Sequence, residues 1–371
     1  MSYFAPNQPA FNYLRHLILP VWDWKAPLSG KELSLYLAHI NQETHKANGW
    51  FYDSILPMPT HSPDGNALIA DVNRGATRSG MGDFYAIPHP NPTLKKDWED
   101  ILEGYFSQEG PLNKIDTLIP QLSRQIGHQP DHPINVILTI PYPSALMSVF
   151  GKLRETGPAL NFSTLSQNLV KASEQRLEAC RWYVDRALQK WKEAGFHNIH
   201  LLGFYWIHET LRYSWEIDDH WVLKELYKHI QRRKSHFFWI PFYSSYNVRL
   251  LKDYRDIYFD CAMLQPGHIF YPYIKDVKEA ALEAKARNAG VELEYYYQLP
   301  DWLGVGKEKH LRFRNYLNGG VKYGYMKEAV CGHFIGKNSI PEMFNSKDPR
   351  EQTTLEDLYH FVKGDYQIKE G

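Results

Sequence analysis

The chain has 371 residues, and its 42 Lys and Arg residues balance its 42 Asp and Glu residues, so its formal net charge is zero. No stripe or block of basic residues stands out, which argues against a nucleic-acid-binding protein. No stretch approaches the roughly 18 apolar residues that a membrane-spanning helix needs. These features favour a globular protein whose partner is neither nucleic acid nor membrane; they leave its oligomeric state open.

Cysteine usage and the first residues of the chain bear on its compartment. The three cysteines, Cys180, Cys261 and Cys331, are odd in number and widely spaced in apolar or helical surroundings. This pattern favours buried free thiols over a disulfide framework. The opening residues, MSYFAPNQPAF, lack the basic and then apolar pattern of a signal peptide. We therefore expect a cytoplasmic protein, with secretion possible only if a leader has been removed.

Eight apolar runs have the length and flanking residues of β-strands. They are residues 14–21, 50–56, 135–140, 199–204, 236–240, 258–264, 291–296 and 329–334. Helical patterns, with apolar residues three and four positions apart, lie between these runs and after the last one. They are residues 31–46, 94–106, 115–126, 174–194, 220–233, 276–288, 307–317 and 354–362.

The alternation of strand and helix predicts a parallel sheet, and a count of eight favours a closed (β/α)8 barrel formed by residues 1–371 as a single domain. The weakest unit is the one between the fifth and sixth strands, where residues 248–256 form a short helix at best. Two segments are longer than the usual strand-to-helix loop. We interpret residues 58–93 as a lid and residues 144–173 as a second insertion on the same face.

Two glutamates are the main candidates for function. Glu209 follows the fourth predicted strand in IHLLGFYWIHE, and Glu294 stands near the end of the seventh in VELEYYY. The carboxyl ends of barrel strands form the catalytic face. Two carboxylates facing each other across an aromatic-lined mouth are typical of enzymes that cleave glycosidic bonds.

Alternation along the seventh strand indicates which side chains point inward. Val291 and Leu293 alternate with Glu292 and Glu294, so if the apolar pair faces the helices, both glutamates face the barrel axis. Glu294 lies nearer the mouth, and Glu292 is predicted to make a buried hydrogen bond or ion pair, for example with His16 or His200. Two plainer interpretations stay open: a buried ion pair for Glu294, and a solvent-exposed loop carboxylate for Glu209.

Several short sequence motifs resemble those of a known family. GFYWIHE, WIPFY, FDCAMLQPGHIF and VELEY, together with TIPYP, resemble motifs found in this order in a bacterial (β/α)8-barrel family catalogued as a domain of unknown function of the DUF4855 type. The resemblance covers most of the chain and implies chemistry like that of glycoside hydrolases. The sequence departs from the family at Gly267, where LQPG stands for LQPN, and at Tyr296, where the family has an acid.

The positions of the two glutamates also resemble those of the large clan of retaining glycosidases. That analogy implies that Glu294 is the nucleophile and that Glu209 is the acid/base. Retention requires carboxyl groups about 5 to 5.5 Å apart, whereas inversion requires roughly 6.5 to 9.5 Å. The sequence does not distinguish the two.

Further residues near the strand ends could contact a sugar. Aromatic side chains offer flat faces for stacking on sugar rings; the candidates are Trp22, Trp24, Tyr142, Tyr205, Trp206, Tyr243, Tyr295 and Trp302. Polar side chains could bond to hydroxyl groups; the candidates are Asp23, Asp53, His208, Gln265, His268 and Glu292. Many of these residues could equally belong to the core or to capped turns.

Other chemistries have less support. No HExxH motif, no Cys and His spacing of a zinc site, no complete P-loop, no GxGxxG and no GxSxG occurs in the sequence. We therefore expect no cofactor and no metal. The acidic EIDDH is better explained by Asp218 or Asp219 capping the next helix. Two hypotheses remain: a glycoside hydrolase of unknown substrate acting on an oligo- or polysaccharide, and a non-catalytic carbohydrate-binding barrel.

Overall fold

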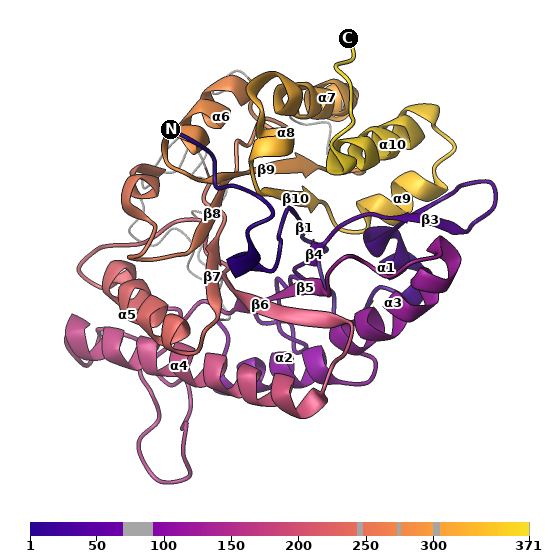
Figure 1. Cartoon of the computed structure of the whole chain (residues 1–371). Helices are drawn as coiled ribbons and strands as arrows, with labels where there is room; N and C mark the ends of the chain where they lie inside the picture. The colour runs from indigo at the N-terminus through magenta and orange to yellow at the C-terminus, as the bar shows by residue number, and fades with distance from the viewer. Residues whose placement is uncertain (70–91, 243–247, 273–275, 300–304, 371) are drawn as a thin grey trace.

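The protein is a closed parallel barrel surrounded by helices. The computed structural model describes residues 1–69, 92–242, 248–272, 276–299 and 305–370. Eight strands hydrogen-bond in a ring in the order β1-β10-β9-β8-β7-β6-β5-β4. They are β1 (His16–Ile18), β4 (Ser54–Ile55), β5 (Ile134–Ile140), β6 (Ile199–Trp206), β7 (His236–Trp239), β8 (Cys261–Leu264), β9 (Gly290–Tyr295) and β10 (Cys331–Ile335). The predicted (β/α)8 barrel is thus confirmed, and Figure 1 shows the strands inside the ring of helices.

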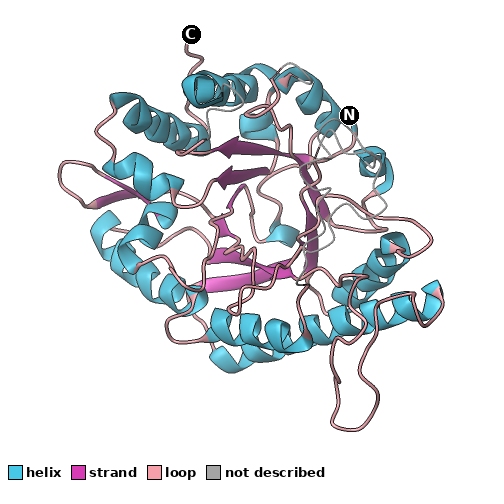
Figure 2. Cartoon of the chain, turned by 180° about the vertical axis from the view of Figure 1, so that it is seen from behind, coloured by secondary structure: helices cyan, strands magenta, loops and turns pink. Residues whose placement is uncertain are grey.

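The helices cover the outside of the barrel, as Figure 2 shows from the opposite side. They are α1 (Gly30–Leu37), α2 (Lys95–Phe106), α3 (Pro111–Ile126), α4 (Leu169–Ala194), α5 (Asp219–Arg232), α6 (Val277–Ala286), α7 (Val305–Tyr323), α8 (Tyr325–Glu328), α9 (Ser339–Asn345) and α10 (Pro349–Lys363). Asp218 caps α5 by accepting a hydrogen bond from the Trp221 amide, as the EIDDH pattern predicts. Residues 248–256, predicted to be a short helix at best, contain the 3-10 helix η3 (Val248–Asp253).

The first helix is shorter than predicted. We expected a helix over residues 31–46, but α1 ends at Leu37, and an antiparallel pair follows, formed by β2 (Ala38–Ile40) and β3 (Ala47–Trp50). The Asn41 side chain accepts hydrogen bonds from the amides of Glu43 and Thr44. Such local side-chain to backbone bonds compete with helical ones. The helical prediction is therefore wrong after Leu37.

The N-terminal segment closes the amino end of the barrel. Its 3-10 helix η1 (Pro9–Phe11) places the Phe11 ring against His236, the first residue of β7, with ring centroids 4.1 Å apart. In Figure 1 this indigo segment crosses the middle of the ring. At the same end, Asp53 accepts hydrogen bonds from the amides of Arg15 and His16. The prediction that Asp53 contacts a sugar at the mouth is therefore wrong.

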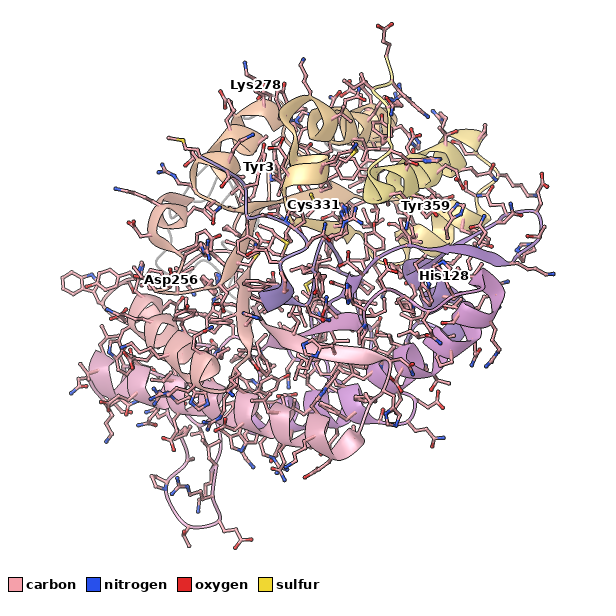
Figure 3. All side chains as sticks on the ribbon, viewed as in Figure 1. Tyr3, His128, Asp256, Lys278, Cys331 and Tyr359 are labelled. Carbon is pink, nitrogen blue, oxygen red and sulfur yellow. The ribbon has the colours of Figure 1, made fainter. Side chains whose placement is uncertain are left out.

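The three cysteines are buried free thiols, as the sequence predicts. Cys331 begins β10 inside the ring of helices, where Figure 3 labels it. In the part of the chain that the structure describes, no helix combines the length and the apolar character that crossing a membrane requires.

Two long connections lie at the carboxyl ends of the strands. The predicted lid begins after β4, and its residues Met58, Thr60 and Ile69 line a pocket there; residues 70–91 lie outside the described residues. The second insertion, predicted over 144–173, ends earlier because α4 already begins at Leu169, where the Asn168 side chain caps it. A bridge between Gly151 and Leu160 closes this loop on itself.

Candidate active site

A pocket of about 300 Å³ opens at the carboxyl ends of the barrel strands. Its walls combine apolar and aromatic side chains with three carboxylates. The lining residues are Leu19, Met58, Thr60, Ile69, Tyr205, Ile207, Glu209, Ile240, Phe242, Gln265, Gly267, Phe270, Tyr271, Glu292, Glu294, Tyr296 and Phe334. Glu209 and Glu294, predicted from the sequence to face each other, both line this one pocket.

The alternation of side chains along the strands selects the lining residues. From β6 and the residues after it, Tyr205, Ile207 and Glu209 reach the pocket. From β9 and the residue after it, the lining residues are Glu292, Glu294 and Tyr296. Each set follows the two-residue period of a strand, and in both sets the period continues beyond the last strand residue. Glu294 itself lies within β9, one residue before its end, rather than just past it.

Glu294 is held by two hydrogen-bond donors. The Tyr316 hydroxyl, from α7, lies 3.1 Å from Oε2 of Glu294. The same hydroxyl accepts the amide N–H of His268 at 2.8 Å, so its own hydrogen is directed at Glu294. The backbone N–H of Gly267 also donates to the Glu294 carboxyl. Both donors stabilise the ionised form of the carboxyl group.

Gly267 presents its N–H from a left-handed backbone conformation, with φ at +65°. A Cβ atom there would lie 2.7 Å from the Phe242 ring. Among residues with a side chain, Asn tolerates this backbone region best. Glycine suits this position on both counts, because it adopts the left-handed conformation freely and has no Cβ to meet the Phe242 ring.

Burial and mutual repulsion alter the acidity of the carboxylates. Burial, followed by the charge of Glu209, raises the pKa of Glu294 from its ordinary 4.5 to about 8, although Tyr316 and Gly267 act in the opposite direction. Burial, followed by the charges of Glu294 and Glu209, raises the pKa of Glu292 well above its usual range, and a hydrogen bond with Gln265 opposes this. The carboxyl groups of Glu292 and Glu294 therefore hold their protons more tightly than free glutamates do.

This raised pKa predicts that the carboxyl of Glu294 lowers the stability of the fold as pH rises. Between pH 4.5 and about 8 the unfolded chain has lost the proton that folded Glu294 still holds. Folding must then take up a proton, so the free energy of unfolding falls as pH rises and levels off above about pH 8. In the variant Glu294→Gln, the side chain at this position does not titrate. We expect its melting temperature to exceed that of the wild type by a few degrees at pH 8, and by less at pH 5.

Thermal unfolding of both proteins at pH 5, 6, 7 and 8 checks this expectation. The control is Glu178→Gln, which removes an exposed carboxylate from α4. A difference between Glu294→Gln and wild type that stays constant across this range would contradict the proposed burial of an ionisable Glu294.

Several predicted sugar-contacting residues lie beside the pocket rather than in it. Trp22, Asp23 and Trp24 line a second hollow at the same face, of about 320 Å³, which shares Thr60 with the first. Asp23 pairs with Lys337 at 2.6 Å, and this contact lowers the pKa of Asp23. These three residues could contact only the outlying parts of a large ligand.

Tyr142, Trp206 and His208 belong to a buried layer behind the wall. The Tyr142 hydroxyl donates to Asp219, 3.2 Å away, and its ring contacts Trp206 and His208. Asp219 also pairs with Arg176 at 2.5 Å, and both side chains are buried. None of the three predicted residues lines the pocket, so their assignment as sugar-contacting residues is corrected: they support the strand that carries Glu209.

Tyr295 also points away from the pocket. Its hydroxyl donates to Glu351 on α10 at 2.6 Å, on the helix side of the barrel. Tyr295, predicted to stack on a sugar, therefore does not line the pocket, whereas its neighbour Tyr296 does. The aromatic residues Phe242, Phe270 and Phe334 line the pocket too, and the sequence-based prediction did not include them.

Among the polar candidates, Tyr205, Gln265 and Glu292 line the pocket as predicted. His268 does not line the pocket, but its backbone N–H donates to the hydroxyl of Tyr316, which in turn contacts Glu294. Glu292 contacts Gln265 and does not pair with His16, whose ring nitrogen lies 3.0 Å from His333 instead. His200 is exposed on β6, and among the described residues it makes no contact with Glu292.

Two aromatic candidates, Tyr243 and Trp302, lie outside the described residues. Within the described part of the chain, no group of three or more His, Cys, Asp or Glu side chains is arranged to hold a metal ion.

Together, the closed parallel barrel and the pocket at the carboxyl ends of its strands define a protein of the (β/α)8-barrel class. The chain belongs to the family described as Domain of unknown function (DUF4855), whose model matches residues 23–360. A comparison with curated proteins found no match.

One solved structure that the comparison matched is a variant of trehalose-6-phosphate hydrolase (TreA) from Bacillus licheniformis in complex with PNG. The sequences are 10% identical and the TM-score is 0.37, over 95% of this chain and 73% of that one.

Proposed function

We propose that this protein is a glycoside hydrolase of the retaining type, with Glu294 as nucleophile and Glu209 as acid/base. One observation carries the proposal: Glu209, which follows β6, and Glu294, on β9, line a single pocket although β7 and β8 separate their strands, and Tyr316 and Gly267 donate to Glu294. Aromatic walls beside two carboxylates suit a sugar ring, which has apolar faces and polar edges.

In the first step an oxygen of the Glu294 carboxylate attacks the anomeric carbon. The bond from that carbon to the leaving oxygen breaks, and its electron pair stays on the oxygen, which takes the proton of Glu209. In the second step water attacks the same carbon and gives a proton to Glu209. The bond to Glu294 breaks, and its electron pair returns to the carboxylate. The net change is the addition of one water molecule across the glycosidic bond.

The electrostatics of the pocket bear on this division of roles. Because like charges in a buried site repel, the charge of Glu209 raises the pKa of Glu294 beyond the effect of burial. The two donors on Glu294 act the other way and stabilise the negative charge that attack on the anomeric carbon requires, so the ionised nucleophile becomes more populated as pH rises toward about 8. A protonated acid opposite an ionised nucleophile is the state that the first step requires.

A hydrolysis screen tests the proposal. Purified protein is incubated with aryl glycosides of both anomeric configurations and with soluble oligosaccharides, and release of the aryl alcohol or of reducing ends is measured. We expect turnover of at least one glycoside, with the product's first-formed anomer, observed by NMR, matching that of the substrate. Sugar binding without turnover on any member of the panel would favour the non-catalytic barrel, and an inverted product would contradict the covalent step.

A further inference from the structure

The pocket holds one more carboxylate than hydrolysis requires. Glu209 and Glu294 account for both chemical roles, yet Glu292 lines the same pocket and is 2% exposed. Its Oε2 atom is buried and has no hydrogen-bond partner among the described residues. A buried carboxyl oxygen without a partner costs free energy unless a proton or a ligand satisfies it.

The described lining residues offer no positive charge to this oxygen. The pocket is lined by three glutamates, one Gln, one Thr and several Tyr residues, and no Lys, Arg or His is among them. Such a surface disfavours anionic ligands and favours cationic ones. Because no group of acidic, His or Cys side chains in the described part of the chain is arranged to hold a metal ion, the complementary cation is an extended organic one.

The aromatic walls favour the same kind of ligand. The rings of Tyr205, Phe242, Phe270, Tyr296 and Phe334 all line the pocket. Aromatic faces attract ammonium groups through their quadrupole, and desolvation inside a pocket strengthens this attraction. An ammonium group also provides three N–H donors and no acceptor, which matches an oxygen that lacks a donor.

The position of Glu292 along the strand sets where the cation would lie. Glu292 precedes Glu294 by two residues on β9, which places it roughly 6 to 7 Å deeper in the barrel. That separation is comparable to the width of a pyranose ring. A ring whose anomeric carbon meets Glu294 can therefore direct a substituent on the neighbouring carbon, such as the C2 amine of glucosamine, toward Glu292.

We propose that the sugar bound in this pocket is an amino sugar with a free, unacetylated ammonium group, and that Glu292 is the residue that binds this group. The inference rests on the proposed function for the identity of the ligand as a sugar, and it adds the substrate class. An N-acetylated sugar lacks the positive charge, and a neutral sugar leaves Glu292 dependent on a proton.

The test compares sugars that differ only in this group. Glucosamine, galactosamine, their N-acetyl forms, glucose and galactose are titrated into the intact protein at pH 7 by calorimetry. In parallel, kcat/KM is measured for the aryl glycosides of the same six sugars. We expect at least one of the free amines to be preferred tenfold or more over both its acetylated and its neutral counterpart, as a charge-assisted contact would produce.

The variant Glu292→Gln tests whether Glu292 causes the preference for the free amine. Glu292→Gln keeps the shape of the side chain and loses the charge, so we expect the ratio between the free amine and the acetylated sugar to fall at least tenfold. The six-sugar comparison on wild type does not depend on this variant, and circular dichroism verifies that the variant folds.

The outcomes separate the inference from the proposed function. Hydrolysis of a neutral or acetylated glycoside with no preference for the amine would overturn the inference and leave the proposed function standing. Binding of the amine that depends on Glu292 without any turnover would support the inference while contradicting the proposed function. A preference for the amine that Glu292→Gln leaves unchanged would overturn the role of Glu292.

Discussion

Glu294→Gln should abolish turnover, lowering kcat by at least about 10⁴-fold on whichever glycoside the wild type hydrolyses. The amide keeps the size of the carboxyl group but has no negative oxygen to attack the anomeric carbon, so no covalent intermediate forms. Binding should survive, because Gln fills the same space on β9 and can still accept a hydrogen bond from Tyr316. Steady-state kinetics measure the loss of turnover, and calorimetry measures the retained binding.

Two controls separate lost chemistry from lost structure. Glu178→Gln removes an exposed carboxylate from α4 and should retain wild-type kinetics. A fluorinated glycoside that forms but does not release the intermediate should label the wild-type peptide containing Glu294 and leave Glu294→Gln unlabelled. Wild-type hydrolysis by Glu294→Gln, or a label on another residue, would remove Glu294 from the role of nucleophile.

The barrel could be predicted from the sequence because each strand is a short apolar run bounded by turn residues, and each helix carries an apolar stripe. The prediction failed where a local polar contact decided the outcome. After Leu37 the chain still has a helical pattern, but Asn41 bonds to the amides of Glu43 and Thr44 and favours a turn. The spacing of apolar residues alone does not reveal such a hydrogen bond.

The alternation of side chains along the strands is sufficient to predict which residues of β6 and β9 line the pocket. The rule that turns Glu292 and Glu294 inward also turns Tyr296 inward and Tyr295 outward. It likewise places Tyr205 in the pocket and Trp206 behind it. Tyr295 and Trp206 were predicted to contact a sugar because they are aromatic. The alternation of side chains along β9 and β6 would have placed both on the side away from the pocket.

Other parts of the site could not be predicted from local pattern. Tyr316 lies in the middle of α7, 22 residues after Glu294, and only the packing of that helix on the barrel brings its hydroxyl to the carboxyl. The Gly267 amide is a backbone donor, whose direction depends on a left-handed φ that the LQPG sequence permits without requiring. Such contacts depend on tertiary structure.

Glu209→Ala should slow hydrolysis by an amount that depends on the leaving group. General acid catalysis contributes roughly 10²- to 10⁴-fold, and this contribution is lost in full when the leaving oxygen is a poor one. A dinitrophenyl glycoside leaves without a proton, so its first step should be nearly unaffected and the covalent intermediate should accumulate. Rapid-mixing kinetics would show this as a burst of released phenol followed by slow turnover.

Added azide distinguishes the acid/base role of Glu209 from a structural one. Azide is a nucleophile that needs no general base, and the truncated side chain leaves room for it beside the anomeric carbon. It should therefore speed the slow second step of Glu209→Ala and give a glycosyl azide of the substrate's anomeric configuration. Azide should not speed Glu294→Gln by this route, because no intermediate forms there to be attacked. If azide leaves Glu209→Ala unchanged and all leaving groups are slowed equally, Glu209 is not the acid/base, and another group in the pocket supplies the proton.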